Sequence, residues 1–231
     1  ADPRTSGATD GRDVASSAGV RGEHAFRSRV ESGRRWLSTR LSWILGTFAA
    51  GFFVLGIGRP AFWLDEVATV QDAGQDLPDL WSFLGRRDVA LGPYYLLVHG
   101  WLRLGDALGP GPAEWWVRLP SAAAMTVAVV AVADIARRRW GTVSAVTAGI
   151  SMILLPVASR YAQEARPYAF AIAFAVLAVW VLERADGRRR WWVAYAVVVA
   201  MLGLSHVVGL LTLVAHPLFV RSARRLRLRA W

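Results

Sequence analysis

The sequence predicts an all-α fold, a polytopic membrane helix bundle with about six transmembrane helices and interfacial helices in its first external loop. Three observations support this prediction: the apolar composition, six separate apolar runs, and blocks of arginine at the ends of those runs. Hydrophobic residues make up 55% of the chain, 12 residues are tryptophan, and the mean hydropathy is +0.33. Soluble domains of this length are normally less apolar. The lipid bilayer is therefore a predicted partner of the chain.

The N-terminal segment, residues 1–40, differs from the rest of the chain in composition. It is rich in Gly, Ser, Ala, Asp and Arg and has little apolar periodicity. Such a segment buries too little apolar surface to offset the entropy lost on ordering, so a disordered cytoplasmic tail is predicted. No apolar run with a small-residue cleavage site precedes Leu41, and a cleaved secretory signal is not expected. Residues 41–231 are predicted to form one transmembrane module.

Six apolar runs are candidates for membrane spans, judged against the roughly 20 residues that cross a hydrocarbon core of about 30 Å. They are residues 41–58, 119–135, 143–158, 168–182, 191–204 and 207–220. The last two runs are short and meet at Ser205 and His206. They are interpreted as two spans because one helix of some 30 residues would overshoot the core.

The arginines predict the orientation of the spans. All 27 basic residues are arginine, and blocks of them lie at 137–139, 184–190 and 221–229. With the tail inside, all three blocks are cytoplasmic, as the positive-inside rule requires. The loop 59–118 and the turn 160–168 are then external, and both termini are cytoplasmic in a multi-pass protein of the cell membrane. Anchoring and orientation also explain the net charge of +10 without a nucleic-acid partner.

The external loop 59–118 contains two segments with helical patterns. Residues 64–84 combine spaced apolar residues with acids. Residues 93–104 are apolar and aromatic but too short to cross the membrane. Pro93 suits the first turn of a helix, where its missing N–H has no partner to lose. The second segment is therefore predicted to be an interfacial helix on the outer leaflet.

Two adjacent acids, Asp65 and Glu66, are the candidate catalytic residues. They lie just beyond the first span, where anchoring does not require carboxylates. A carboxylate within hydrogen-bond reach of an acceptor hydroxyl can take up its proton. Asp65 is the candidate base, and Glu66 is expected to position it or to contribute to the acceptor site. The alternative is that both acids cap the helix that begins there.

A second charged segment, residues 160–168, interrupts the apolar runs on the same predicted side. It is expected to converge with Asp65 on one cavity at the outer membrane boundary. Arginine suits phosphate there, because its planar fork binds two oxygens at once. The alternatives are that Glu164 pairs with Arg166 and that Arg160 only reaches the lipid headgroups. The candidate substrate-binding residues are Arg59, Arg160, Glu164, Arg166, Tyr168 and His206.

Metal and thiol chemistry have little support in the sequence. The chain has no cysteine, which excludes disulfides and thiolate metal sites. His99 and His206, together with Asp65 and Glu66, offer the groups for a divalent ion, but no metal-ligand spacing accompanies them. A structural role is the simpler interpretation of each histidine. No metal and no other cofactor are predicted.

Four short motifs occur in a recognisable order. They are the Asp-Glu pair at 65–66, Pro-Tyr-Tyr-Leu-Leu at 93–97, Arg-Leu-Pro-Ser at 118–121 and Gln-Glu-Ala-Arg-Pro-Tyr at 163–168. This order resembles the membrane glycosyltransferases of the GT-C type. The resemblance covers about residues 59–216. It is strongest to the branch with protein O-mannosyltransferases and the lipid A aminoarabinose transferase.

The resemblance implies transfer of a sugar from a polyprenyl-phosphate donor to a lipid, glycan or protein acceptor on the external face. Members of this superfamily usually have about twice as many spans, so the chain is expected to be an N-terminal portion, unless the remaining half is absent or supplied by another chain. Two other classes stay open. A transporter module would place ionisable groups at mid-membrane depth, where these runs have almost none. A non-catalytic scaffold or assembly subunit would keep the spans but would not need Asp65.

Overall fold

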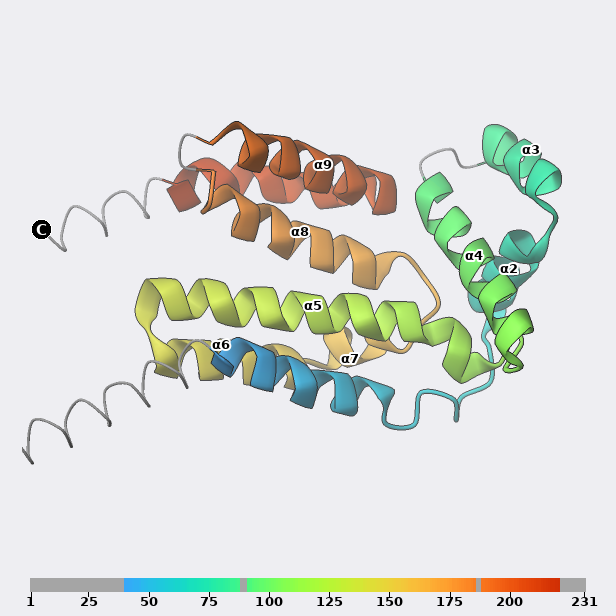
Figure 1. Ribbon diagram of the computed structural model, residues 1–231, viewed down its shortest axis with the longest axis horizontal. Helices are drawn as coiled ribbons and strands as arrows, with labels where there is room; N and C mark the ends of the chain where they lie inside the picture. The colour runs from blue at the N-terminus through green and yellow to red at the C-terminus, as the bar shows by residue number, and fades with distance from the viewer. Residues whose placement is uncertain (1–39, 88–90, 186–187, 221–231) are drawn as a thin grey trace, which may run out of the picture. The chain divides into compact units, whose positions relative to one another are not determined.

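The computed structural model describes residues 40–87, 91–185 and 188–220 (Figure 1). The predicted tail up to residue 39 and the arginine block 221–229 lie outside the described residues. Every regular element within the described ranges is helical, which confirms the all-α class. The helices from Leu41 onward belong to one compact unit, Leu41–Trp231.

Long helices packed side by side form the bundle (Figure 1). Helix α5 packs against both α6 and α8, and α8 packs against α9. Alanines and a few larger side chains, among them Phe53, Met125 and Ile153, fill the core between them. The elements are the first helix Arg40–Val54, α5 (Glu114–Trp140), α6 (Thr142–Leu154), α7 (Pro156–Ala162), α8 (Tyr168–Leu182), α9 (Arg189–Ser205) and a last helix Val207–Val220, which begins as the 3₁₀ stretch η2 (Val207–Ala215).

Three helices from the predicted external loop lie together beside the start of α5 (Figure 1). They are α2 (Leu64–Gly74), α3 (Leu77–Arg87) and α4 (Gly92–Leu108). Leu80, Tyr95 and Val98 form a second buried cluster there, which also contains Ala165 from the turn before α8. This cluster brings the loop helices next to the 163–167 turn.

The prediction of one helix over residues 64–84 was wrong, because the chain divides there into α2 and α3. Gln75 is extended, with ψ of 164°. Pro78 lacks the amide hydrogen that a continuous helix would donate to the carbonyl of Gly74. The second predicted segment forms a helix that is longer than expected, 17 residues in α4.

Helix length does not confirm six membrane spans. Among the described residues, only Glu114–Trp140 is long and apolar enough to cross a bilayer, and the pair α6 and α7 adds a second if counted as one span bent by 63°. The apolar helices Arg40–Val54, Tyr168–Leu182 and Val207–Val220 are shorter. An unbroken helix over 143–158 was also wrong. Leu155 is extended because the residue before a proline disfavours the helical conformation, and α7 starts at Pro156.

Two glycines allow the first helix to approach its neighbours closely. A Cβ atom on Gly46 would collide with Cγ2 of Val130 in α5. A Cβ atom on Gly149 in α6 would lie 2.8 Å from Cδ1 of Leu45. Small residues at helix contacts are a common means of packing in membrane bundles. The position of the first helix therefore depends on the absence of a side chain at Gly46 and at Gly149.

The glycine contact predicts a difference between two otherwise matched variants. We expect Gly46→Val to destabilise the protein by about 1–3 kcal/mol, the usual cost of overpacking. Gly51→Val in the same helix is the control, since a Cβ there meets nothing within 4 Å. Thermal unfolding in detergent measures both. Equal midpoints for the two variants would contradict the close packing of this helix on α5.

Candidate functional site

A buried ion pair between Glu66 and Arg118 lies at the centre of the candidate site. The exposed fractions of their side chains are 0% and 2%. Arg118 donates from Nε to Oε1 of Glu66 over 2.8 Å and from Nη2 to Oε2 over 2.6 Å. This two-bonded geometry is the strongest form of an arginine–carboxylate pair. It joins α2 to α5 across 52 positions of sequence.

Arg118 also holds the segment that follows the first helix. Its Nη1 atom donates to the carbonyls of Ile57 and Pro60, each over 2.8 Å, and Nη2 donates to Ala61 over 3.4 Å. Together with the bonds to Glu66, these use all five N–H donors of a guanidinium. The segment from 57 to 61 is thereby fixed next to α2.

Glu66 connects the pair to the turn before α8. Its Oε1 atom accepts the backbone N–H of Ala165 over 2.7 Å. Its Oε2 atom accepts the N–H of Trp63 over 3.4 Å, at the start of α2. The predicted capping role of Glu66 is thus present alongside the contact with Arg118. One carboxylate thereby ties together α2, α5 and the 163–167 turn.

Asp65 and Arg166 meet beside this buried pair. Arg166 Nη2 lies 3.7 Å from Oδ2 of Asp65, whose side chain is 44% exposed. This distance confirms that the Asp-Glu segment and the 160–168 segment converge. Thr69 supports the contact, because its hydroxyl donates to the Asp65 carbonyl over 2.9 Å and accepts from Arg166 Nη1 over 3.4 Å. Asp65 thus combines solvent access with a neighbouring positive charge.

The Arg166 guanidinium has a well-defined electrostatic environment. Burial acts to lower the pKa of Arg166, but a hydrogen bond with Tyr168 and the attraction of Asp65 outweigh it, so that its pKa is raised. Its Nε atom is buried without a hydrogen-bond partner among the described residues. Arg166 therefore keeps its positive charge beside Asp65.

Arg160 and Glu164 pair with each other at the edge of the site. The bond from Arg160 Nε to Glu164 Oε1 is 2.8 Å long. The Arg160 side chain is 67% exposed, whereas that of Glu164 is largely buried. Oε2 of Glu164 has no hydrogen-bond partner within the described ranges. The alternative that Glu164 pairs with Arg166 is not observed, since the partner of Glu164 is Arg160.

Tyr168 and His206 belong to a row of rings beside Arg166. The ring centroid of Tyr168 is 4.9 Å from that of Tyr161 and 5.9 Å from that of His206. The Arg166 guanidinium carbon lies 5.9 Å from the Tyr168 ring centroid. Aromatic rings of this kind offer apolar faces next to charge. His206 thus reaches the site from the end of α9.

Arg59 is the one candidate residue that no described side-chain contact brings to this cluster. It is exposed, and its backbone N–H bonds to the carbonyl of Gly56 over 2.9 Å. His99 is also separate from it. Its Nδ1 lies 2.8 Å from the carbonyl of Ala73 in a buried contact, as expected of a structural histidine. No group of three or more metal-ligating side chains occurs in the part of the chain that the structure describes.

Sequence reasoning did not select Arg118, Thr69 or Tyr94 as site residues. Arg118 stood in the Arg-Leu-Pro-Ser motif, but only as an external arginine. Tyr94 lies in α4, and burial raises its pKa, against the opposing effect of Arg166. Its hydroxyl therefore stays neutral. The motifs at 93–97 and 118–121 held the signal for two of these residues.

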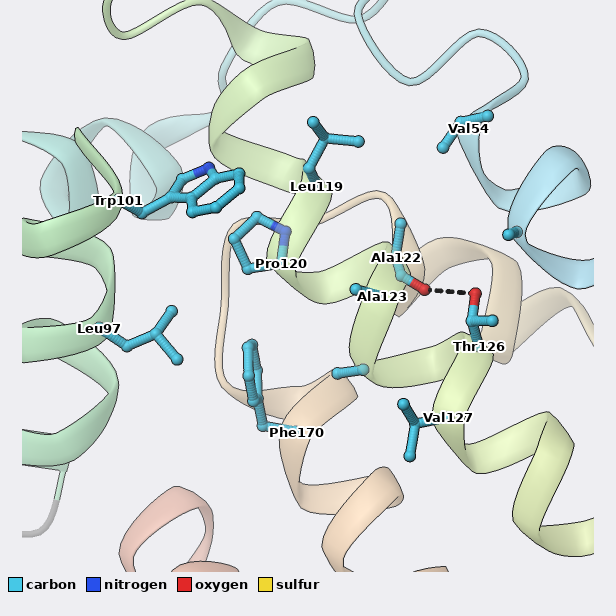
Figure 2. A pocket seen from close by; sticks show the side chains of 12 residues that line it. Val54, Leu97, Trp101, Leu119, Pro120, Ala122, Ala123, Thr126, Val127 and Phe170 are labelled. Atoms are coloured by element: carbon cyan, nitrogen blue, oxygen red, sulfur yellow. Dashed lines mark hydrogen bonds between the residues drawn. The ribbon is translucent and has the colours of Figure 1, made fainter. Parts of the chain in front are cut away.

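An apolar cavity of about 710 Å³ lies against α5 between Leu119 and Val127 (Figure 2). In Figure 2, Leu97 and Trp101 of α4 face Leu119, Pro120 and the alanines of α5, with Phe170 of α8 at one side. Leu119 directly follows Arg118. The Phe170 ring centroid lies 5.7 Å from that of Tyr94. The cavity is therefore adjacent to the charged site.

Comparison with known proteins identifies the family. Residues 96–229 match the dolichyl-phosphate-mannose-protein mannosyltransferase family. The chain belongs to this family. The match includes Arg118 and the whole 160–168 segment, while Asp65 and Glu66 precede it. No curated protein and no solved structure matches the chain.

Family membership confirms the GT-C resemblance. Members of the dolichyl-phosphate-mannose-protein mannosyltransferase family are membrane glycosyltransferases that depend on dolichyl-phosphate mannose. The chain is therefore a glycosyltransferase that uses a polyprenyl-phosphate sugar. This supports the enzyme interpretation over the transporter and scaffold alternatives.

The buried ion pair predicts a large loss of stability when one partner is neutralised. Glu66→Gln leaves the Arg118 charge buried with a weaker partner, and removing one partner of such a pair costs about 3–5 kcal/mol. Asp76→Asn is the control, because the exposed pair of Asp76 with Arg103 is worth about 0–1 kcal/mol. Thermal unfolding in detergent compares them. Similar midpoints for both variants would show that the buried pair does not hold the site together.

Proposed function

We propose that the chain transfers a sugar from a polyprenyl-phosphate carrier to a hydroxyl of an acceptor on the external membrane face. The observation that carries this proposal is the half-exposed Asp65 carboxylate, 3.7 Å from Arg166 and backed by the buried pair of Glu66 and Arg118. A base and a fixed cation side by side match the needs of glycosyl transfer from a phosphate.

The proposed reaction is an inverting displacement at the anomeric carbon. The acceptor oxygen forms a bond to that carbon while its proton passes to the Asp65 carboxylate. The bond between the carbon and the phosphate oxygen breaks, and its electron pair leaves with the polyprenyl phosphate. Arg166 stabilises the charge that develops on this phosphate, and Arg160, with its exposed side chain, contributes from the edge.

The other candidate residues support this centre in different ways. Glu66 is fully enclosed by its partners, so we assign it to positioning α2 and the turn rather than to contact with substrate. The unpaired Oε2 of Glu164 and the rings of Tyr168 and His206 are proposed substrate contacts. Arg59 is proposed to contact the donor phosphate from the segment that Arg118 holds.

The apolar cavity beside Arg118 is the proposed place for the first isoprene units of the donor (Figure 2). Its lining is almost entirely apolar, and the hydroxyl of Thr126 is already used in a 2.8 Å bond to the Ala122 carbonyl. An apolar chain in this cavity would place its phosphate at the neighbouring charged site. No divalent ion enters the proposed mechanism.

We also propose that the chain has six spans, with residues 1–40 and the C-terminal end in the cytoplasm and loop 59–118 outside. The alternation of the helices and the arginine-rich end of the bundle support this topology. The short apolar helices would span with help from their flanking turns and snorkelling arginines.

The mechanism predicts that substitutions of Asp65 and Arg166 affect different kinetic quantities. Asp65→Asn keeps the shape of the side chain and removes the base, so turnover should fall by about 10² to 10⁴ with little change in donor affinity. Arg166→Ala should weaken donor binding, because a phosphate contact acts before as well as during the reaction. The assay uses membranes and a panel of polyprenyl-phosphate sugars. Asp79→Asn, another exposed acid of the loop, is the control.

If the wild type is active in the assay and Asp65→Asn is equally active, Asp65 is excluded as the base. Loss of activity in Asp79→Asn would show that the effect is not specific to Asp65. The assignment of Asp65 as the base would then lose its support.

The topology predicts labelling from opposite sides. Because the chain has no cysteine, Gln75→Cys and Arg188→Cys each introduce a single thiol. A membrane-impermeant maleimide should label Gln75→Cys on intact cells and Arg188→Cys only after the membrane is opened. The reverse pattern would invert the orientation and place the site in the cytoplasm.

A further inference from the structure

A second apolar groove lies at the opposite end of the bundle from α2–α4. It has a volume of about 410 Å³ and opens between α5, α6, α8 and the last helix. Thr212 and His216 are polar residues in its lining. The Thr212 hydroxyl donates a hydrogen bond of 2.8 Å to the Gly209 carbonyl. The rest of the lining is mostly aliphatic and aromatic, and it includes Trp140, Ala215 and Phe219.

A dense set of charges surrounds this end of the bundle. Asp134 accepts hydrogen bonds of 2.7, 2.8 and 2.7 Å from Arg137, Arg138 and Arg184, and a bond of 3.0 Å from Trp180 Nε1. Arg139 pairs with Glu183. The described residues 188–190 are three further arginines. Among the described residues, this end of the bundle thus carries seven arginines and two acids, Asp134 and Glu183, and the excess is strongly positive.

Arg139 connects this charge to the groove. Its guanidinium carbon lies 3.4 Å from the Phe219 ring centroid and 5.9 Å from that of Trp140. Both rings line the groove, and Trp140 is 60% exposed. An apolar surface that ends in tryptophan and arginine is typical of the interface between hydrocarbon and headgroups.

His216 adds a polar atom inside the groove. Its Nδ1 lies 2.8 Å from the Tyr195 hydroxyl. Its Nε2 atom is buried and has no hydrogen-bond partner among the residues that the structure describes. Buried polar atoms normally have a partner, so this position suits a polar atom of a bound molecule.

We propose that this groove binds an anionic phospholipid, with an acyl chain along the apolar lining and the headgroup at the arginines. Size favours a lipid chain over a protein helix. A helix about 10 Å wide and 14 residues long occupies about 1,600 Å³, several times the volume of the groove. Charge selects the headgroup, because each arginine near the membrane surface attracts anionic lipid. The proposal is independent of sugar transfer.

Native mass spectrometry of the purified chain tests the proposal. The protein is mixed with equal amounts of dioleoylphosphatidylglycerol and dioleoylphosphatidylcholine. We expect the phosphatidylglycerol adduct to dominate by about fivefold or more. Ala215→Phe should remove this adduct, since it fills the groove from an exposed position. Val214→Phe, on the same helix but outside the groove, should retain it.

A second pair of variants tests the headgroup contact. Combining Arg138→Gln with Arg190→Gln should reduce the preference for phosphatidylglycerol by up to about fivefold per charge, while Arg103→Gln at the other end should leave it unchanged. Equal retention of both lipids by the wild type, or of phosphatidylglycerol by Ala215→Phe and Val214→Phe, would overturn the proposal. So would displacement of the adduct by a polyprenyl phosphate, or a tightly bound polypeptide in its place.

Discussion

The buried pair of Arg118 and Glu66 is the interaction on which the geometry of the α2–α4 end of the bundle depends. Two charges removed from water are tolerated only when their bonding capacity is satisfied, and here the arginine uses every N–H that it has. Such a pair adds little net stability compared with apolar packing. It adds specificity instead, because any other arrangement of α2 and α5 would leave a charge buried and alone.

This constraint explains why neighbouring acids do different work. Successive residues on a helix point about 100° apart, so fixing Glu66 toward Arg118 turns Asp65 toward solvent and Arg166. The bond from Ala165 N–H to Glu66 fixes the turn that carries Arg166 in the same step. The Asp65 carboxylate, which is the proposed base, and the neighbouring Arg166 are thereby held by a residue that need not touch the substrate.

The sequence was sufficient for the helical class, the family and the convergence of the two charged segments. It could not distinguish the buried acid from the exposed one, since Asp65 and Glu66 have the same charge and stand side by side. It also could not pair Glu66 with Arg118, because a contact across 52 positions leaves no local pattern. The apolar patterns predicted unbroken helices over 64–84 and 143–158, although α2 ends before the extended Gln75 and α6 ends before Leu155, which precedes Pro156. The number of membrane spans was the least predictable feature. Hydropathy measures how apolar a segment is, but it does not give the length of the helix that the segment forms.

The two ends of the bundle use carboxylates differently. At one end, Asp134 accepts hydrogen bonds from three arginines and an indole, and it ties α5 to α8. At the other, the corresponding structural task falls to Glu66, and Asp65 keeps a half-exposed carboxylate beside a single arginine. A carboxylate with several donors is held in place and strongly favoured in its charged form, whereas a catalytic base must gain and lose a proton. In the proposed mechanism, the separation of anchoring from reactivity between adjacent residues lets the α2–α4 end of the bundle be both rigid and reactive, while the arginine-rich end is suited to the proposed lipid contact.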